Sequence, residues 1–119
     1  METIKHFKEL KVWQKGIEIV KDIYEITKHF PKEEMYGLAT QMRRSAISIP
    51  SNIAEGFKRF HAKEYVQFLY IALGSLAELE TQIFIAKEIG LLEDTKMDFM
   101  NEKLDHTSKM LSSLISKLR

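Results

Sequence analysis

Residues 65–86, YVQFLYIALGSLAELETQIFIA, form the most apolar stretch of the chain, and apolar residues recur in it every three or four positions. This spacing predicts an α-helix with one side on a protein core. The core-facing stripe comprises Tyr65, Phe68, Leu69, Ala72, Leu76, Leu79, Ile83 and Ala86. A second apolar stripe, turned about 100° around the helix, comprises Val66, Leu73, Ala77 and Phe84. A helix with two apolar sides is expected to have more than one packing partner.

Outward from this stretch, the periodicity predicts helices over residues 62–89, 7–29, 32–57 and 94–118, with breaks near Pro31, residues 56–61 and Gly90. Pro50 is expected to kink the second helix without ending it. A close helix crossing would explain Gly74. Residues 1–119 are therefore expected to form a single all-α domain, an antiparallel up-down four-helix bundle. Its predicted core includes Trp13, Ile17, Met42, Ile53, Phe68, Ala72, Leu76, Ile83, Leu104 and Leu111.

Length and composition exclude several classes of protein. A chain of 119 residues with 45% hydrophobic and 29% charged residues is typical of one globular domain. The absence of cysteine excludes disulfides, thiolate metal sites and cysteine nucleophiles. Neither a signal peptide nor an uninterrupted apolar run of about 18 residues is present. We therefore expect a soluble cytoplasmic protein with no membrane partner.

The sequence lacks the motifs of catalysis. A di-metal bundle enzyme needs Glu-x-x-His on two helices, whereas Glu25 and His29, like Glu102 and His106, are four positions apart. Glycine-rich phosphate loops and Gly-x-Ser-x-Gly are also missing. The expectation is a protein that is not an enzyme and holds neither a metal nor a cofactor.

Charge is unevenly distributed although the net charge is only +1. Residues 41–63 carry five cations against the single carboxylate of Glu55, and residues 64–104 carry eight carboxylates against three lysines. The five cations are Arg43, Arg44, Lys58, Arg59 and Lys63. They are candidates for a nucleic-acid-binding patch, because phosphate contacts need cations without exact spacing. A solvated face that balances the charges of a neighbouring helix or subunit is the alternative.

A polar stripe along residues 41–59 has three interpretations. It is a solvated face, a polar network buried between subunits, or a ligand or nucleic-acid surface. Its members are Gln41, Arg44, Ser48, Asn52, Glu55 and Arg59.

The second apolar stripe of residues 62–89 predicts a homo-oligomer, because monomers rarely expose large apolar patches. Its candidate interface residues are Val66, Leu73, Ala77 and Phe84. Coverage by loops or termini is the alternative.

Four segments resemble one known family. They are residues 7–15 (FKELKVWQK), 36–46 (YGLATQMRRSA), 48–56 (SIPSNIAEG) and 68–81 (FLYIALGSLAELET). In this order they resemble the small four helix bundle protein family, which includes proteins encoded by intervening sequences in bacterial 23S rRNA genes. The resemblance covers about residues 5–92. It implies a ring-like homopentamer without known enzyme activity.

A branch of the family resembles the accessory variability determinant of diversity-generating retroelements, which binds nucleic acid and a reverse transcriptase. Many family members have Gly in place of Lys58, and Ser or Thr in place of His61. The turn before residue 62 is therefore expected to be more basic and less well capped here. The resulting hypothesis is a non-enzymatic homo-oligomer that binds RNA. A scaffold for another protein, such as a polymerase or ribosomal component, is the alternative.

Overall fold

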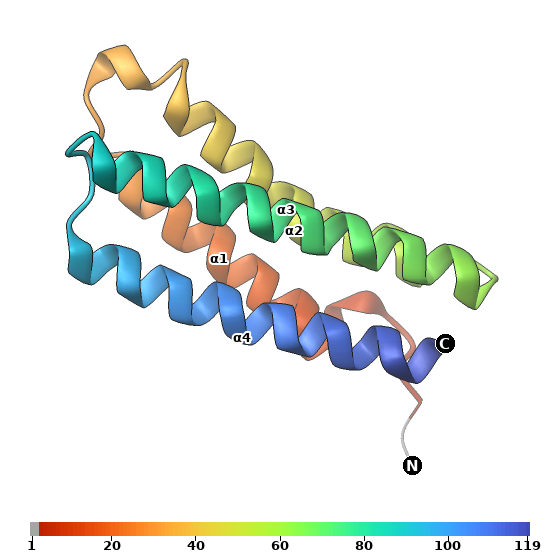
Figure 1. The fold of residues 1–119 in the computed structure, drawn as a ribbon. Helices are drawn as coiled ribbons and strands as arrows, with labels where there is room; N and C mark the ends of the chain where they lie inside the picture. The colour runs from red at the N-terminus through yellow and green to blue at the C-terminus, as the bar shows by residue number, and fades with distance from the viewer. Residues whose placement is uncertain (1–2) are drawn as a thin grey trace.

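The computed structural model describes residues 3–119, and within this range it contains four α-helices and no strand. The helices are α1 (Lys11–Thr27), α2 (Leu38–Phe57), α3 (Ala62–Glu88) and α4 (Asp94–Leu118). Figure 1 shows the chain running along α1, returning along α2, and repeating this course through α3 and α4. Each helix packs against two others, in the pairs α1–α2, α2–α3, α3–α4 and α1–α4. The prediction of an all-α four-helix fold is confirmed.

The helices α1 and α2 begin later than the periodicity predicts. The His6 side chain accepts from the Lys8 amide at 3.2 Å, and the Glu9 carboxylate accepts from the His6 amide at 2.8 Å. These bonds close a separate 3-10 turn, η1 (Phe7–Glu9), and the extended Leu10 separates it from α1. A second 3-10 turn, η2 (Lys32–Glu34), follows Pro31 and is closed by backbone hydrogen bonds alone. Apolar residues continue through both turns at helical spacing. The periodicity therefore predicted each turn as part of the helix that follows it.

The junction between α3 and α4 lies where the sequence predicted it. Gly90 adopts a positive φ of 84°, which glycine tolerates best. The Leu91 amide donates to the Ala86 carbonyl at 2.8 Å, and the Gly90 amide donates to the Lys87 carbonyl at 3.1 Å. This pair of bonds is a Schellman motif, which satisfies carbonyls at the end of α3 and stops the helix.

Most of the predicted core is buried. The confirmed residues are Met42, Ile53, Ala72, Leu76, Ile83, Leu104 and Leu111. Trp13, Ile17 and Phe68 are only partly buried. Trp13 lies in the first turn of α1 and packs on the Phe7 ring at 5.5 Å, and Phe68 lies beneath the Arg59 guanidinium. Ile17 lies about 100° around α1 from the buried Gly16, which directs it away from the bundle axis.

Two glycines bring helices into close contact. A Cβ on Gly16 of α1 would lie 3.2 Å from the Pro50 Cβ of α2, so the proline ring fills the space beside Gly16. Helix α2 continues through Pro50 from Leu38 to Phe57, and the kink there stays a prediction. A Cβ on Gly56 would lie 2.9 Å from the Phe68 Cβ of α3. No helix of the same chain crosses at Gly74, because a Cβ there would have no other part of the described chain within 4 Å.

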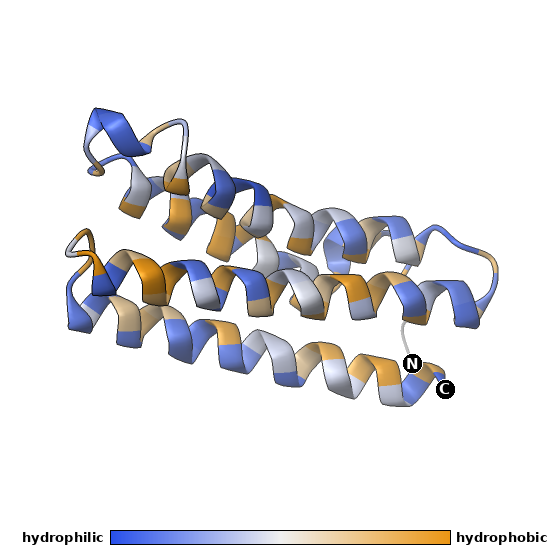
Figure 2. Cartoon of the chain, turned by 45° about the horizontal axis from the view of Figure 1, so that its top comes forward, coloured by the Kyte–Doolittle hydropathy of each residue, from blue (hydrophilic) through white to orange (hydrophobic). Residues whose placement is uncertain are grey.

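Helix α3 is apolar on its outer side as well as its inner side. By length and composition alone it is apolar enough to cross a membrane, with a mean hydropathy of 1.3 in its most apolar window. Its inner side supplies Leu69, Leu76 and Leu79 to the core between α2 and α4. Figure 2 shows hydrophobic colour around the C-terminal part of α3. The exposed large hydrophobic residues on this helix are Tyr70, Ile71, Phe84 and Ile85.

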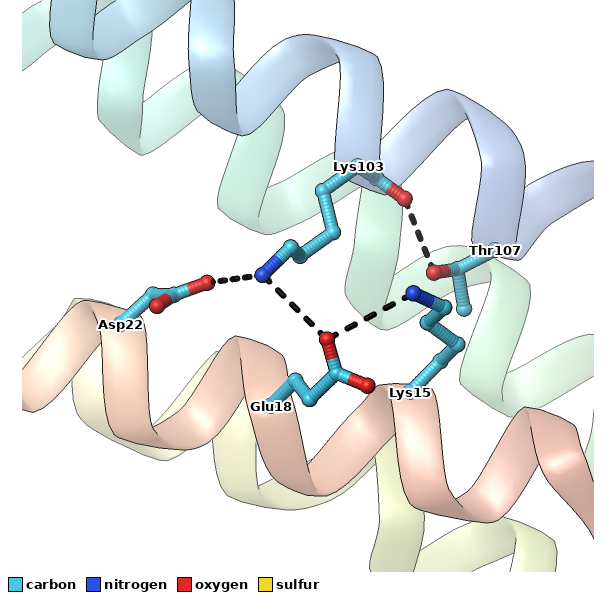
Figure 3. Close-up of polar contacts among 5 residues, drawn as sticks. All are labelled: Lys15, Glu18, Asp22, Lys103 and Thr107. Carbon is cyan, nitrogen blue, oxygen red and sulfur yellow. Dashed lines mark hydrogen bonds and ion pairs between the residues drawn. The ribbon is translucent and has the colours of Figure 1, made fainter.

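An ion-pair network joins α1 to α4, the two helices at the ends of the chain. The Lys103 ammonium donates to Asp22 Oδ2 at 2.6 Å and lies 3.5 Å from Glu18 Oε1, which Lys15 also approaches at 3.5 Å (Figure 3). Burial lowers the pKa of Lys103, but the hydrogen bond and charge of Asp22, aided by Glu18, raise it overall. Burial likewise raises the pKa of Glu18, and Lys15 and Lys103 outweigh that effect and lower it.

The variant Lys103→Ala is expected to lower the free energy of unfolding by about 1 kcal/mol at neutral pH. Because the pKa of Glu18 is lowered in the folded state, its contribution exists above its ordinary value of 4.5 and disappears as the pH falls below it. The difference between the variant and the parent should therefore shrink at pH 3 in urea unfolding.

The control is Lys109→Ala, which breaks a pair between Lys109 and Asp105 that lies within α4. The Lys109 and Asp105 side chains are both more than 60% exposed, so this variant should lower the free energy of unfolding by less than about 0.5 kcal/mol. Equal losses in the two lysine variants, or a Lys103→Ala difference that does not change with pH, would contradict the role of the network.

Candidate nucleic-acid interface

The turn between α2 and α3 holds three of the five predicted nucleic-acid-binding cations. Lys58, Arg59 and Lys63 are exposed and surround the short link from Phe57 to Ala62. Arg59 lies 4.7 Å from the centre of the Phe68 ring and 3.8 Å from the Glu55 carboxylate. Its side chain is still 44% exposed, so these contacts orient the guanidinium without removing it from solvent.

His61 occupies the N-cap position of α3 and makes no side-chain capping bond there. Serine or threonine at this position would offer a hydroxyl to the first free amides of the helix. The expectation of a poorly capped turn is therefore confirmed. Because no capping bond holds the His61 side chain, it faces solvent beside the three cations.

The fold brings further cations to this turn from both ends of the chain. The Lys58 ammonium lies 6.0 Å from the Phe7 ring, and a hollow of about 460 Å³ lies between Phe7 and residues 54–59. Lys63 and Arg119 line one shared groove, while Lys11, Lys109 and Lys117 line another. Figure 1 shows both described ends of the chain at the same end of the bundle as this turn.

We name this region the basic end and define it by its cations in residues 3–11, 55–64 and 109–119. They are Lys5, Lys8, Lys11, Lys58, Arg59, Lys63, Lys109, Lys117 and Arg119. Glu9, Glu55 and Glu64 oppose them in those ranges, and Asp105 pairs with Lys109 from just outside. Sequence analysis missed six of these cations, because no local pattern shows that the two ends of the chain meet the α2–α3 turn.

Arg43 and Arg44 lie elsewhere on α2. They precede Lys58 by 14 or 15 positions, which corresponds to about 21 Å along a helix. Arg43 Nε donates to Thr27 Oγ1 at 2.8 Å, and its guanidinium stacks on the Tyr24 ring at 4.5 Å. The structure therefore holds Arg43 against α1. Arg44 is exposed and belongs to a different surface, between α2 and α3.

The polar stripe of α2 divides into parts. In its middle, Ser48 Oγ and Ser75 Oγ of α3 are hydrogen-bonded at 2.8 Å, and the Asn52 amide donates to Ser48 Oγ at 2.9 Å. These contacts connect the two helices. Toward the start of α2, a shallow hollow of about 220 Å³ lies between α2 and α3. It is lined by Gln41, Arg44, Ser45, Ser48, Glu78 and Gln82.

This hollow contains unpaired polar groups. Within the described chain, neither Arg44 nor Glu78 forms an ion pair, and the buried Gln82 Oε1 accepts no hydrogen bond. Buried polar atoms are seldom left without a partner. The hollow therefore presents polar groups that a second surface could pair with.

The four predicted interface residues have two different environments. Val66 and Leu73 are partly buried and pack on the bundle core. Ala77 and Phe84 are exposed, and Phe84 is 54% exposed. The exposed arc of α3 is thus shifted around the helix from the predicted stripe. We name it the outer arc, and it comprises Tyr70, Ile71, Gly74, Ala77, Glu78, Thr81, Phe84 and Ile85.

No group of three or more histidine, aspartate or glutamate side chains within residues 3–119 is arranged to hold a metal ion. Glu25 of α1 and His29, which follows the end of that helix, lie 3.7 Å apart, and both side chains are exposed.

Comparisons with known proteins give one family. The model of the 23S rRNA-intervening sequence protein family matches residues 8–113. A solved structure with a similar fold is a protein of unknown function from the S23 ribosomal protein family of Bacteroides thetaiotaomicron. The two chains are 23% identical, with a TM-score of 0.81 over 87% of this chain and 97% of the other. No curated protein matches the sequence.

Proposed function

Because the chain belongs to the 23S rRNA-intervening sequence protein family, we propose that it is a non-enzymatic homo-oligomer that binds RNA through its basic end. The observation that carries this proposal is the meeting of nine cations from three separate segments, against Glu9, Glu55, Glu64 and the Asp105 carboxylate that pairs with Lys109. Phosphate recognition needs such a field of exposed cations. Because the family is named for intervening sequences of 23S rRNA, RNA is the polyanion that we expect this surface to bind.

The proposed contact is made to phosphates and not to base edges. The helices carry no aromatic-rich sheet or other known base-reading module. A single basic end offers few phosphate contacts, whereas an oligomer repeats it and raises avidity without any new contact. Binding should therefore be salt-sensitive, and stronger for the oligomer than for a single chain.

Reversing three charges tests the RNA proposal. The triple variant Lys58→Glu, Arg59→Glu and Lys63→Glu should weaken binding to a structured RNA at least about tenfold. The slope of its plot of log affinity against log salt concentration should decrease in magnitude by about one for each phosphate that the protein no longer binds. Filter binding at several salt concentrations measures both quantities.

The matched control reverses Lys21, Lys32 and Lys96, which lie outside the basic end and change the net charge equally. This control should bind almost as the parent protein does. Equal losses in the two triple variants would mean that only the net charge matters. Binding by the parent that is undetectable at low salt, or independent of salt, would refute the RNA proposal.

The homo-oligomer is supported by the outer arc of α3. Its exposed apolar residues include Ile71, Phe84 and Ile85, and Gly74 lies near the middle of the arc without a contact. Glycine in an exposed helix costs about 1 kcal/mol relative to alanine. A second helix crossing closely at Gly74 would offset that cost, and the polar hollow beside the arc would gain partners. The resemblance to the bundle family makes a pentamer the expected size.

Light scattering should give a mass several times 13.9 kDa, most simply five times. Phe84→Glu should dissociate the oligomer and leave the helical circular dichroism signal unchanged, because Phe84 is outside the bundle core. The control is Phe99→Glu on α4, whose parent residue is equally exposed at 54% but lies away from the outer arc. A parent protein that is monomeric at micromolar concentration would refute self-association. The outer arc would then favour the alternative function, a scaffold for another protein.

A further inference from the structure

Phe60 is the most exposed aromatic residue of the described chain, with a fractional exposure of 100%. It lies in the α2–α3 turn between Arg59 and His61. Its aromatic neighbours are engaged, since Phe57 packs edge-on against Tyr65 at 6.1 Å and Phe68 lies beneath Arg59. The Phe60 ring makes no such contact within residues 3–119. Neither packing nor turn geometry requires a phenyl group there.

The ring stands inside the densest part of the basic end. Lys58 and Arg59 precede it directly, and Lys63 follows three positions later. Aromatic rings next to cations are the arrangement with which proteins hold single-stranded nucleic acid: the cations follow the backbone and the ring stacks on a base. In a duplex the bases are stacked on one another, and an A-form groove does not admit a ring to their faces.

We propose that Phe60 stacks on an unpaired base of RNA bound at the basic end, so that the protein prefers single strands and loops to duplex. This inference rests on the proposed function and names the form of RNA that the basic end recognises. It adds to the phosphate contacts a second contact that depends on base exposure and not on base identity. In an oligomer, each subunit would contribute one such ring.

The test compares two RNA probes of known form. One is a fluorescent oligouridylate of twelve nucleotides, which has little structure of its own, and the other is a twelve-base-pair RNA duplex. Phe60→Ala should weaken binding of oligouridylate by about 5- to 100-fold, which is the usual effect of removing one stacking ring. Duplex affinity should change less than about twofold, because the cations are unchanged.

Three further variants separate stacking from other causes. Phe60→Leu keeps an apolar side chain without a π-face and should behave nearly as Phe60→Ala. Phe60→Trp should keep the affinity, and its fluorescence should be quenched by oligouridylate but not by duplex, after subtraction of the Trp13 signal of the parent. Tyr36→Ala removes an aromatic residue that is 98% exposed in the α1–α2 connection and should have no effect on either probe.

The outcomes distinguish this inference from the proposed function. If the parent binds neither probe at low salt, both fail. If the parent binds both probes and Phe60→Ala binds them equally well, the stacking inference fails and the proposed function stands. If Phe60→Ala dissociates the oligomer, or loses both probes alike, the ring has a structural role and the inference is overturned. It is also overturned if the variant keeps both RNA probes and loses only its binding to anionic phospholipid vesicles.

Discussion

Replacing Leu76 by alanine is expected to lower the free energy of unfolding by about 2–5 kcal/mol. Leu76 lies at the middle of α3, is 2% exposed, and belongs to the main cluster of buried residues. The change removes buried apolar surface and leaves a cavity that the packed helices cannot fully close. Urea unfolding, performed at a protein concentration where light scattering reports single chains, measures the loss.

The matched control is Ile71→Ala, five positions earlier on the same helix, where the side chain is 51% exposed. Its loss should stay within about 0.5 kcal/mol, since surface substitutions rarely exceed that value. Similar losses at the two positions would show that the inner and outer sides of α3 are assigned wrongly.

Replacing Gly56 by alanine is expected to destabilise the fold by about 1–3 kcal/mol, although alanine is the better helix former. The new Cβ would lie 2.9 Å from both the Phe68 Cβ and the Tyr65 Cδ1, and 3.1 Å from the Tyr65 carbonyl oxygen. The last of these atoms belongs to the backbone of α3 and cannot move aside alone. Helices α2 and α3 must therefore separate at this end, which unfolding measurements would detect.

Gly74→Ala makes the same chemical change in a helix with open space around it. In the assembly-deficient Phe84→Glu background it should stabilise the chain by up to about 1 kcal/mol. In the parent background the added methyl group should instead weaken self-association. A gain in stability from Gly56→Ala would contradict the close contact of α2 and α3.

The sequence predicted the fold wherever local signals agree with the packing. Gly90 marks the end of α3, and the helix bounds of residues 62–89 and 94–118 are right within one residue. The start of α1 was wrong because the bond between Glu9 and His6 closes a short turn before the helix. The crossing expected at Gly74 is absent within the chain, because a single glycine does not reveal which side of its helix meets a neighbouring helix.

The candidate site was only partly predictable. Lys58, Arg59 and Lys63 are close in sequence, so their charge was visible before the fold was known. Lys11, Lys117 and Arg119 are far from this turn in sequence. They join the basic end only because the four-helix fold brings both described ends of the chain to the same end of the bundle. Arg43 was misleading for the opposite reason: although it lies in a basic segment, Thr27 and Tyr24 hold it against α1.

Which helices are neighbours in the native structure has a consequence for how the chain folds. Three of the four helix pairs join consecutive helices, and only α1 with α4 joins segments distant in sequence. Folds whose contacts are mostly local have low contact order and reach the native state within microseconds to milliseconds. Each helical hairpin forms across a short connection, so little loop entropy is lost before its contacts are made. Docking of α4 on α1 completes the four-helix bundle and is expected to be the last step of folding.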